Sequence, residues 1–183
     1  MTPPKKPRPK GEIQPFAQLD LEIAGLGFIL YSPFAVAHIA DGEDYLQTHF
    51  WEPEAVAKHI NACTLTGFGT GSPGRYHLSF LDRAASVEEE NRATMKLRLG
   101  IEVRDGVICV RDLYDLMDWS AACPAEQQVR VRDGFYRLTV LSDPPATGII
   151  GDNQHITVSF ERTPKKPLIR HAGVPDLTPD DED

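Results

Sequence analysis

Apolar and polar residues alternate along much of this chain, which is the pattern of β-strands that bury one face. The longest example places apolar side chains at every second position from Ala93 to Val103. It leads into Asp105-Gly106, a pair that tolerates the positive φ angles of a tight turn, and then into the β-branched run Val107–Val110. These residues predict a β-hairpin.

A second segment of the same kind lies further along the chain. Asp133-Gly134 separates Val129–Arg132 from Phe135–Leu141, and Ile156–Phe160 follows after a loop rich in Pro and Gly. Shorter runs of the same character add three strands before the centre of the chain. These runs are Leu19–Ile23, Phe28–Tyr31 and Tyr76–Phe80. The pattern therefore predicts seven or eight short strands.

Helix signals are fewer. Pro53 suits a first helical position, acidic residues on both sides of it favour the positive end of the helix dipole, and the apolar stripe predicts a helix that ends near Asn61. A second short helix is expected over Asp112–Trp119. Ser86–Glu89 has the form of a capping box, although the alternation that follows limits that helix to one or two turns.

Many short strands and few helices predict a mainly β protein, namely a two-layer antiparallel β-sandwich with one or two short helices laid against it or across an end. The chain has 183 residues of ordinary globular composition, which is enough for one such domain. We predict a disordered basic arm at residues 1–12, the sandwich domain at 13–162 and a Pro-rich acidic tail at 163–183.

Charge narrows the classes of partner. The whole chain has 19 Lys and Arg against 27 Asp and Glu, and residues 11–162 alone carry 12 against 22, a net charge of −10. This balance disfavours direct nucleic-acid binding by the folded domain and favours a basic protein partner. No apolar run could span a membrane and no secretory signal is visible. Three cysteines without a paired spacing fit a reducing cytoplasm.

Motifs that would indicate catalysis or cofactor binding are weak. Gly69–Gly74 has the spacing of a dinucleotide loop, but a strand pattern and not a helix follows it, so a flexible hairpin loop is expected. The histidines and carboxylates show no metal-ligand spacing. Cys63 lies four residues after His59, yet a small buried thiol near a helix end is more typical of packing. We therefore expect no enzyme, no cofactor and no metal.

The remaining feature is an acidic and aromatic stretch. Asp112, Asp115 and Asp118 recur every third residue beside Tyr114 and Trp119, and such a helix would offer aromatic anchors with a row of carboxylates. An exposed helix with a core tryptophan is the alternative reading. The predicted partner-binding residues are Asp112, Tyr114, Asp115, Asp118 and Trp119, with Glu52 and Glu54 as secondary candidates.

The order of these segments resembles the competence protein J family, small bacterial inhibitors of a DNA-entry nuclease. The likeness spans about residues 19–160 and departs from the family in an insertion at Asp112–Gln128 and in the two charged ends. It rests on the strand at Phe28–Tyr31, Trp51-x-x-Glu54-Ala55-Val56-x-Lys58, the strand at Tyr76–Phe80, the turn at Asp105-Gly106, Val131-x-Asp133-Gly134-x-Tyr136-x-Leu138-Thr139 and the closing strand at Ile156–Phe160. The resemblance implies a protein that works by binding, with no catalytic residues.

Two functions of different classes follow. The first is a non-enzymatic acidic protein of bacterial type that neutralises a basic effector, such as a nuclease toxin, by occluding its active cleft. The second is a small-ligand or sugar-binding β-sandwich, catalytic or not, that uses the loops Gly67–Gly74 and Thr147–His155 at one end. A structural adaptor that assembles through its charged ends is a blander third reading.

Overall fold

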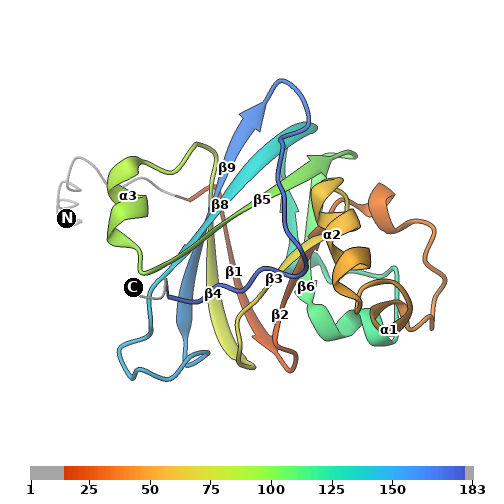
Figure 1. The fold of residues 1–183 in the computed structure, drawn as a ribbon, viewed down its shortest axis with the longest axis horizontal. Coiled ribbons are helices and arrows are strands. Elements are labelled where there is room, and N and C mark those ends of the chain that lie inside the picture. Colours follow the sequence, from red (N-terminus) through yellow and green to blue (C-terminus); the bar gives the residue numbers. More distant parts are fainter. Residues whose placement is uncertain (1–14, 180–183) are drawn as a thin grey trace, which may run out of the picture.

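The computed structural model describes residues 15–179, and the predicted basic arm at residues 1–12 lies outside them. Two β-sheets pack together in this part of the chain, which confirms the mainly β, two-layer architecture (Figure 1). Sheet A has the order β1-β4-β9-β8-β5, with β1 (Ala17–Ile23), β4 (Gly74–Leu81), β9 (Gln154–Thr163), β8 (Gly134–Ser142) and β5 (Met95–Val103). Sheet B has the order β3-β2-β6-β7, with β3 (Thr66–Gly69), β2 (Gly27–Tyr31), β6 (Val107–Asp112) and β7 (Gln128–Arg130).

Three short α-helices and three 3-10 helices complete the described elements. These are α1 (Tyr45–His49), α2 (Pro53–Asn61), α3 (Val87–Arg92), η1 (Pro33–Val36), η2 (Leu113–Met117) and η3 (Ala125–Gln127). The α2 prediction is confirmed at both ends. The capping box before α3 is also confirmed, because the Ser86 hydroxyl accepts from the Glu89 N–H while the Glu89 carboxylate accepts from the Ser86 N–H. None of the described helices is long and apolar enough to cross a membrane.

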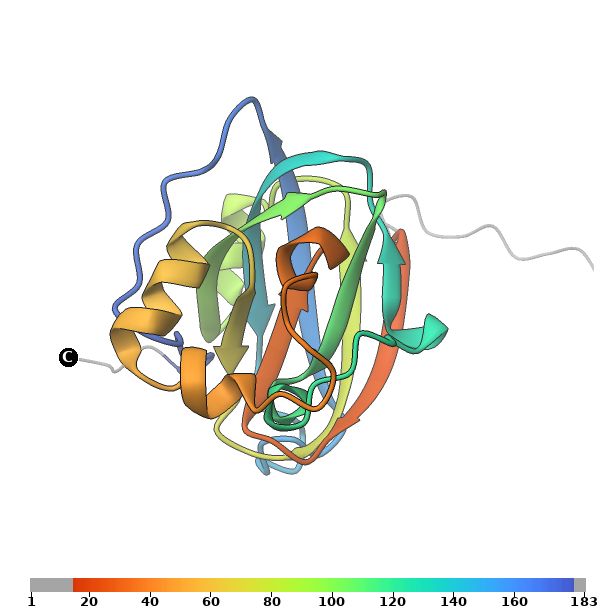
Figure 2. The same ribbon diagram turned by 90° about the vertical axis from the view of Figure 1, so that its right-hand side faces the viewer.

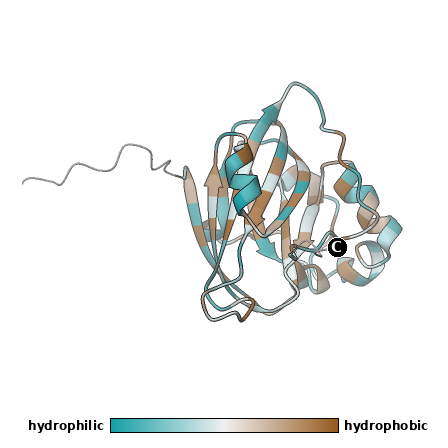
Figure 3. Ribbon diagram, turned by 60° about the vertical axis from the view of Figure 1, so that its left-hand side comes forward, coloured by the Kyte–Doolittle hydropathy of each residue, from teal (hydrophilic) through white to brown (hydrophobic). Residues whose placement is uncertain are grey.

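The helices lie at opposite sides of the sandwich. α1 and α2 sit together on one side, whereas α3 stands alone on the other (Figures 1 and 2). The hydropathy of the strands alternates, and α3 is hydrophilic over most of its length (Figure 3). In β5 the predicted period of two is confirmed, since Leu97, Leu99 and Ile101 are buried and Lys96 and Arg98 are exposed between them.

Aromatic side chains connect the inner faces of the two sheets. Phe28 of sheet B packs on Phe68 with ring centroids 5.6 Å apart, and on Tyr76 of sheet A edge-to-face at 5.3 Å. All three side chains are fully buried. Burying one such side chain stabilises a fold by roughly 1.5–3 kcal/mol, so this cluster is a major part of the contact between the layers.

One strand pair departs from the predicted antiparallel arrangement. β4 and β9 run parallel, with Tyr76 opposite Gln154 and Leu81 opposite Ser159. Parallel neighbours need a long connection, and residues 82–153 supply it by way of α3 and four further strands. Side-chain alternation is the same in parallel and antiparallel strands, so the sequence pattern carries no signal for direction.

Neither Asp-Gly turn forms a hairpin, so the hairpin predicted at Asp105-Gly106 was wrong. β5 lies in sheet A and β6 in sheet B, so the turn at Asp105-Gly106 carries the chain from one layer to the other. Asp133-Gly134 likewise carries it from β7 in sheet B to β8 in sheet A. Asp105 and Gly106 do adopt the expected positive φ angles of 65° and 69°. The same local conformation therefore serves a corner between sheets.

The two corners bind one another. The Gly106 N–H donates to the Asp133 carboxylate at 2.7 Å, and the Val131 N–H donates to the Gly106 carbonyl at 3.1 Å. From the end of β2, the buried Ser32 hydroxyl accepts from the Arg104 N–H at 2.9 Å. These bonds satisfy backbone groups at the point where the chain changes layer.

The segment predicted as an acidic tail packs against the sandwich over its described residues. The Gly69 N–H donates to the Pro175 carbonyl, and the Leu177 N–H donates to the Gly69 carbonyl, both at 2.8 Å. Ile169 and Leu177 are buried. The loop from Gly69 to Gly74 joins β3 in sheet B to β4 in sheet A, so it is a third crossing between layers and not the hairpin loop that we predicted.

The bond between the two corners generates a stability prediction. Asp133→Ala leaves the Gly106 N–H without its carboxylate partner, so we expect a loss of about 1–2 kcal/mol in the free energy of unfolding, measured by urea denaturation. Asp105→Asn is the matched control, because the exposed Asp105 has a positive φ that asparagine also tolerates. Equal losses in the two variants would contradict a role for this bond.

Candidate docking face

A groove opens between α1, the residues just before α2, and η2. Its volume is about 640 Å³, and we call it the α1–η2 groove. The lining residues are Asp44, Leu46, Gln47, Trp51, Glu52, Tyr114 and Met117. They come from two parts of the chain that are about 60 residues apart, so only the fold brings them together.

Large apolar side chains are exposed around this groove. Trp51 is 67% exposed, Met117 49% and Tyr114 41%, which makes them three of the eight large hydrophobic side chains that the structure exposes. Scattered exposed hydrophobic residues are common, whereas several that line one groove indicate a binding surface. Tryptophan and tyrosine are also the residue types that most often supply the central contacts of protein interfaces.

The rim of the groove is strongly acidic. Residues 41–57 contain five carboxylates and residues 112–118 contain three, and neither stretch contains a Lys or Arg. Within residues 15–179, the exposed side chains of Glu52, Glu54 and Asp118 make no hydrogen bond or ion pair. These three carboxylates are free to meet a positively charged partner.

Backbone hydrogen bonds hold the two halves of the face together. The Gly42 N–H donates to the Trp119 carbonyl at 2.7 Å, and the Trp119 N–H donates to the Glu43 carbonyl at 3.0 Å. The Asp41 carboxylate accepts from the Ala121 N–H at 3.0 Å. These bonds join the loop before α1 to the residues after η2.

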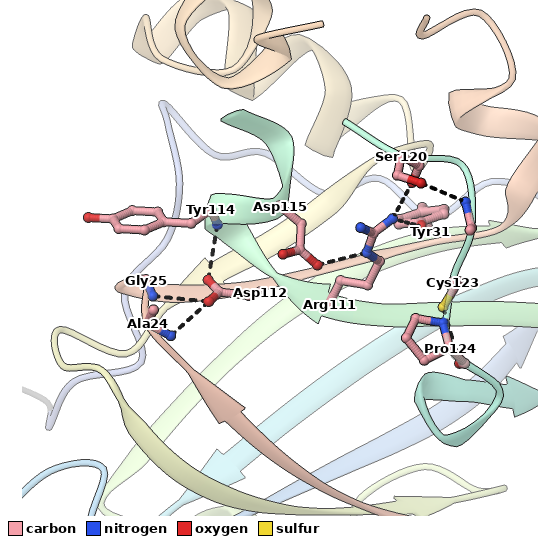
Figure 4. Close-up of polar contacts among 11 residues, drawn as sticks. Ala24, Gly25, Tyr31, Arg111, Asp112, Tyr114, Asp115, Ser120, Cys123 and Pro124 are labelled. Carbon is pink, nitrogen blue, oxygen red and sulfur yellow. Dashed lines mark hydrogen bonds and ion pairs between the residues drawn. The ribbon is translucent and has the colours of Figure 1, made fainter. Parts of the chain in front are cut away.

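Arg111, in β6, holds η2 on sheet B (Figure 4). Its guanidinium is buried, donates to the Asp115 carboxylate at 2.8 Å and to the Ser120 carbonyl at 2.7 Å, and lies over the ring of Trp119. It also donates to the Tyr31 hydroxyl at 3.3 Å. Burial raises the pKa of Tyr31, so the phenol stays neutral beside the cation.

Asp112 positions Tyr114 at the edge of the groove (Figure 4). One carboxylate oxygen accepts from the N–H groups of Ala24 and Gly25, at 2.8 and 3.1 Å, and the other accepts from the Tyr114 N–H at 3.0 Å. Asp112 is therefore the N-cap of η2 and ties it to the turn between β1 and β2. Gly25 permits this approach, because a Cβ there would lie 2.3 Å from the carboxylate.

The structure thus divides the predicted partner-binding residues into two groups. Asp112, Asp115 and Trp119 hold η2 in place, and Trp119 is only 1% exposed. Tyr114 and Glu52 line the groove. Glu54 and Asp118 are exposed nearby, in the first turn of α2 and directly after η2.

Sequence reasoning missed several lining residues. Trp51 and Met117 are exposed, and Asp44, Leu46 and Gln47 line the α1 side. Trp51 stands between the buried Phe50 and the helix start at Pro53, and no local pattern tells which of two adjacent aromatic residues faces solvent. Helix α1 has only five residues, which is too short to show a period.

A cluster of histidines lies beneath α1. The Tyr45 hydroxyl is 3.1 Å from Nε2 of both His38 and His59, and the His49 ring packs on the Tyr45 ring at 4.8 Å. Burial lowers the pKa of His59, and the neighbouring His38, His49 and Lys58 lower it further. His59 is therefore held neutral, able to accept the Tyr45 hydroxyl proton in a hydrogen bond.

The other candidate sites for chemistry are occupied by structural contacts. Cys63 is fully buried and contacts the Pro167 carbonyl, and burial raises the pKa of its thiol to about 11, so the thiol stays protonated near neutral pH. In the Gly69–Gly74 loop the N–H groups of Gly69 and Thr70 donate to backbone carbonyls. Among residues 15–179 no group of three or more His, Cys, Asp or Glu is placed to hold a metal ion.

The two loops of the alternative function lie together at one end. The Arg75 N–H donates to the Gly151 carbonyl at 2.8 Å, which joins the Gly67–Gly74 loop region to the Thr147–His155 loop. A second groove of about 610 Å³ runs along the latter loop towards α3. Its walls include Asp143, Asp152, Asn153 and His155.

Comparison with known proteins shows the fold but no family. No family model and no curated protein sequence matches this chain. Among solved structures, it is similar to ComJ from Bacillus subtilis, an inhibitor of the DNA degrading activity of NucA, with 15% identity over 83% of this chain and 99% of ComJ, at a TM-score of 0.51. It is also similar to the crocagin biosynthetic gene J protein, with 14% identity over 80% of this chain and 97% of that protein, at a TM-score of 0.51.

These likenesses concern the arrangement of the elements. They cover nearly the whole of each compared protein, so the sandwich described above is the fold of ComJ. The resemblance stated from the order of segments is therefore confirmed at the level of structure.

The two tryptophans should respond differently to truncation. Trp119→Ala leaves a cavity under η2 and should reduce the free energy of unfolding by about 3–5 kcal/mol, whereas Trp51→Ala should change it by less than about 0.5 kcal/mol. Urea denaturation followed by circular dichroism measures both variants. Comparable losses would contradict the assignment of one tryptophan to the core and the other to the surface.

The histidine cluster predicts a stability that falls in mild acid. Because the folded pKa of His59 lies below the unfolded pKa, the unfolded chain binds a proton first as the pH drops below about 6.5, and stability is lost until the folded pKa is passed. His59→Gln removes this contribution, so its melting temperature should fall less steeply with decreasing pH than that of the parent chain. Parallel curves between pH 7.5 and 5 would contradict the prediction.

Proposed function

We propose that this protein is a non-enzymatic inhibitor that binds a basic nuclease through the α1–η2 groove and its acidic rim. The observation that carries the proposal is the coincidence of exposed aromatic side chains with carboxylates that have no partner within residues 15–179. The predicted binding residues that keep a direct role are Tyr114, Glu52, Glu54 and Asp118. Asp112, Asp115 and Trp119 act by holding the face in shape.

Electrostatics explains why such a face suits a nuclease. A nuclease must attract phosphates, so its active cleft is positive, and an acidic surface is steered to the same cleft. The inhibitor then competes with DNA for one binding surface. The net charge of −10 over residues 11–162 extends this attraction beyond the contact area at low ionic strength.

The groove provides the specific contact. Trp51 and Tyr114 offer aromatic faces, and the carboxylates of Asp44 and Glu52 stand beside them. A lysine or arginine side chain of the partner fits this environment, because a cation gains both from an aromatic face and from a nearby carboxylate. Insertion of such a side chain would bury Trp51 and fix the orientation of the complex.

The similarity to ComJ supports an inhibitory role. ComJ inhibits the DNA degrading activity of NucA. The structural match with this chain covers 99% of ComJ. A likeness at 15% identity carries no residue-level correspondence, so the choice of face rests on the geometry of this chain alone.

We further propose that the protein acts in the bacterial cytoplasm. All three cysteines are free thiols, including the partly exposed Cys123. A reducing compartment would keep them in this state.

The small-ligand alternative has one supporting observation. The groove of about 610 Å³ beside the Thr147–His155 loop has a polar lining that could hydrogen-bond a sugar or another small polar molecule. It ranks second, because its lining residues include no Trp, Tyr or Phe that could act as a stacking platform.

The main test uses charge reversal on the docking face. The tagged chain is used to capture protein from lysate of its source cells, and the fraction released by high salt is assayed for degradation of plasmid DNA, with and without added chain. We expect a nuclease activity that the parent chain suppresses. Glu52→Lys with Glu54→Lys should weaken binding by on the order of 100-fold, because two attractive contacts become repulsive.

A double variant elsewhere provides the control. Glu88→Lys with Glu126→Lys changes the net charge by the same amount, on exposed residues of α3 and η3 that are outside the groove. This variant should capture and suppress the nuclease as the parent chain does. A salt-released fraction without nuclease activity, or equal effects of the two double variants, would refute the proposed function or the proposed face respectively.

A further inference from the structure

The arginines of the described chain fall into two groups. Of the eleven arginines in residues 15–179, seven form ion pairs with Asp or Glu. Four have no carboxylate partner within residues 15–179, namely Arg130, Arg132, Arg162 and Arg170. Three of these four, Arg130, Arg132 and Arg162, line one pocket of about 190 Å³.

This convergence runs against the charge of the domain. Residues 11–162 hold 22 carboxylates against 12 Lys and Arg, so a carboxylate is the more abundant neighbour for any arginine on this surface. The pocket is nevertheless lined by three arginines and a single acidic residue, Asp82, which is not ion-paired to any of them. We call it the arginine pocket. Its local charge is opposite to that of the rest of the surface.

The backbone explains why the three side chains point the same way. Val129 and Val131 are buried, so Arg130 and Arg132 both face outward from the end of β7 and the residues that follow it. Arg162 comes from the end of β9 and donates from Nη2 to the Asp133 carbonyl at 2.9 Å. Two sheets therefore contribute to one pocket.

Contacts to β8 and β9 hold the walls of the pocket in place. The Tyr136 hydroxyl donates to the Arg132 carbonyl at 2.7 Å. This bond holds the residues just after β7 against β8. Gly134 leaves room for Arg162, because a Cβ at that position would lie 2.9 Å from its Nε. Phe16 forms an apolar wall and packs on Phe160 with ring centroids 5.9 Å apart.

We propose that the arginine pocket binds the phosphate group of a small phosphorylated molecule. Guanidinium groups match the oxygens of a phosphate in a planar, two-point geometry, and three of them can neutralise a dianion despite the carboxylate of Asp82. A pocket of about 190 Å³ accommodates one phosphate group, and the exposed Phe16 side chain gives an apolar contact to the attached organic part. This site shares no lining residue with the α1–η2 groove and does not depend on the nuclease proposal.

The test is a titration of the full chain with small anions at low chloride concentration. Binding is measured by isothermal calorimetry and by the change in melting temperature. The probes are inorganic phosphate and glycerol 3-phosphate, with sodium acetate as the monoanion. We expect saturable binding of a phosphate probe with a dissociation constant of roughly 1 mM or below, and no saturation by acetate. Tighter binding of glycerol 3-phosphate identifies an organic phosphate as the ligand, and equal binding identifies the free ion.

Variants tie the binding to the pocket. Arg132→Gln with Arg162→Gln should weaken phosphate binding at least tenfold, whereas Arg170→Gln removes an equally unpaired arginine outside the pocket and should leave it unchanged. Asp82→Asn should strengthen binding several-fold, which a purely structural role of the pocket would not produce. The proposal is overturned if no phosphate probe saturates by about 10 mM, or if the arginine double variant folds normally and binds as the parent chain does.

Discussion

The docking face depends on a cation that is never exposed to a partner. The guanidinium of Arg111 connects β6 to η2 through Asp115, to the following segment through the Ser120 carbonyl, and to β2 through the Tyr31 hydroxyl. Removing a buried charge of this kind, or one of its partners, leaves polar groups without water or a hydrogen bond. The α1–η2 groove therefore rests on one network, and the exposed Tyr114 and Met117 occupy their positions because that network places η2 on the sheet.

Two groups of carboxylates near the α1–η2 groove have different roles. Asp41, Asp44 and Asp112 accept hydrogen bonds from backbone N–H groups. Each carboxylate therefore takes the place of a backbone carbonyl acceptor. Glu52 and Glu54 stand free at the start of α2. Both kinds add to the negative potential of the surface, but only the free kind can change partners without a loss of fold stability. An acidic composition thus combines structural capping with steering of an encounter.

Local physics made part of this fold predictable from sequence. α2 and the alternation in β5 depend on neighbours within a few residues, and the capping box before α3 is complete within Ser86–Glu89. The corner at Asp105-Gly106 could not be predicted, since a hairpin and a change of sheet use the same turn conformation. Trp119 and Trp51 differ through their tertiary contacts, and Trp119 packs on the ring of Tyr31 and under the guanidinium of Arg111.

The segment at residues 176–179 also covers an edge strand of each sheet. Asp176 forms a bridge with Gly69 in the outer strand of sheet B, and Pro179 forms one with Met95 in the outer strand of sheet A. Unprotected sheet edges recruit strands from other molecules and start aggregation. Residues 176–179 therefore cover two sheet edges at once, and their removal would leave both edges open to strand addition from another molecule.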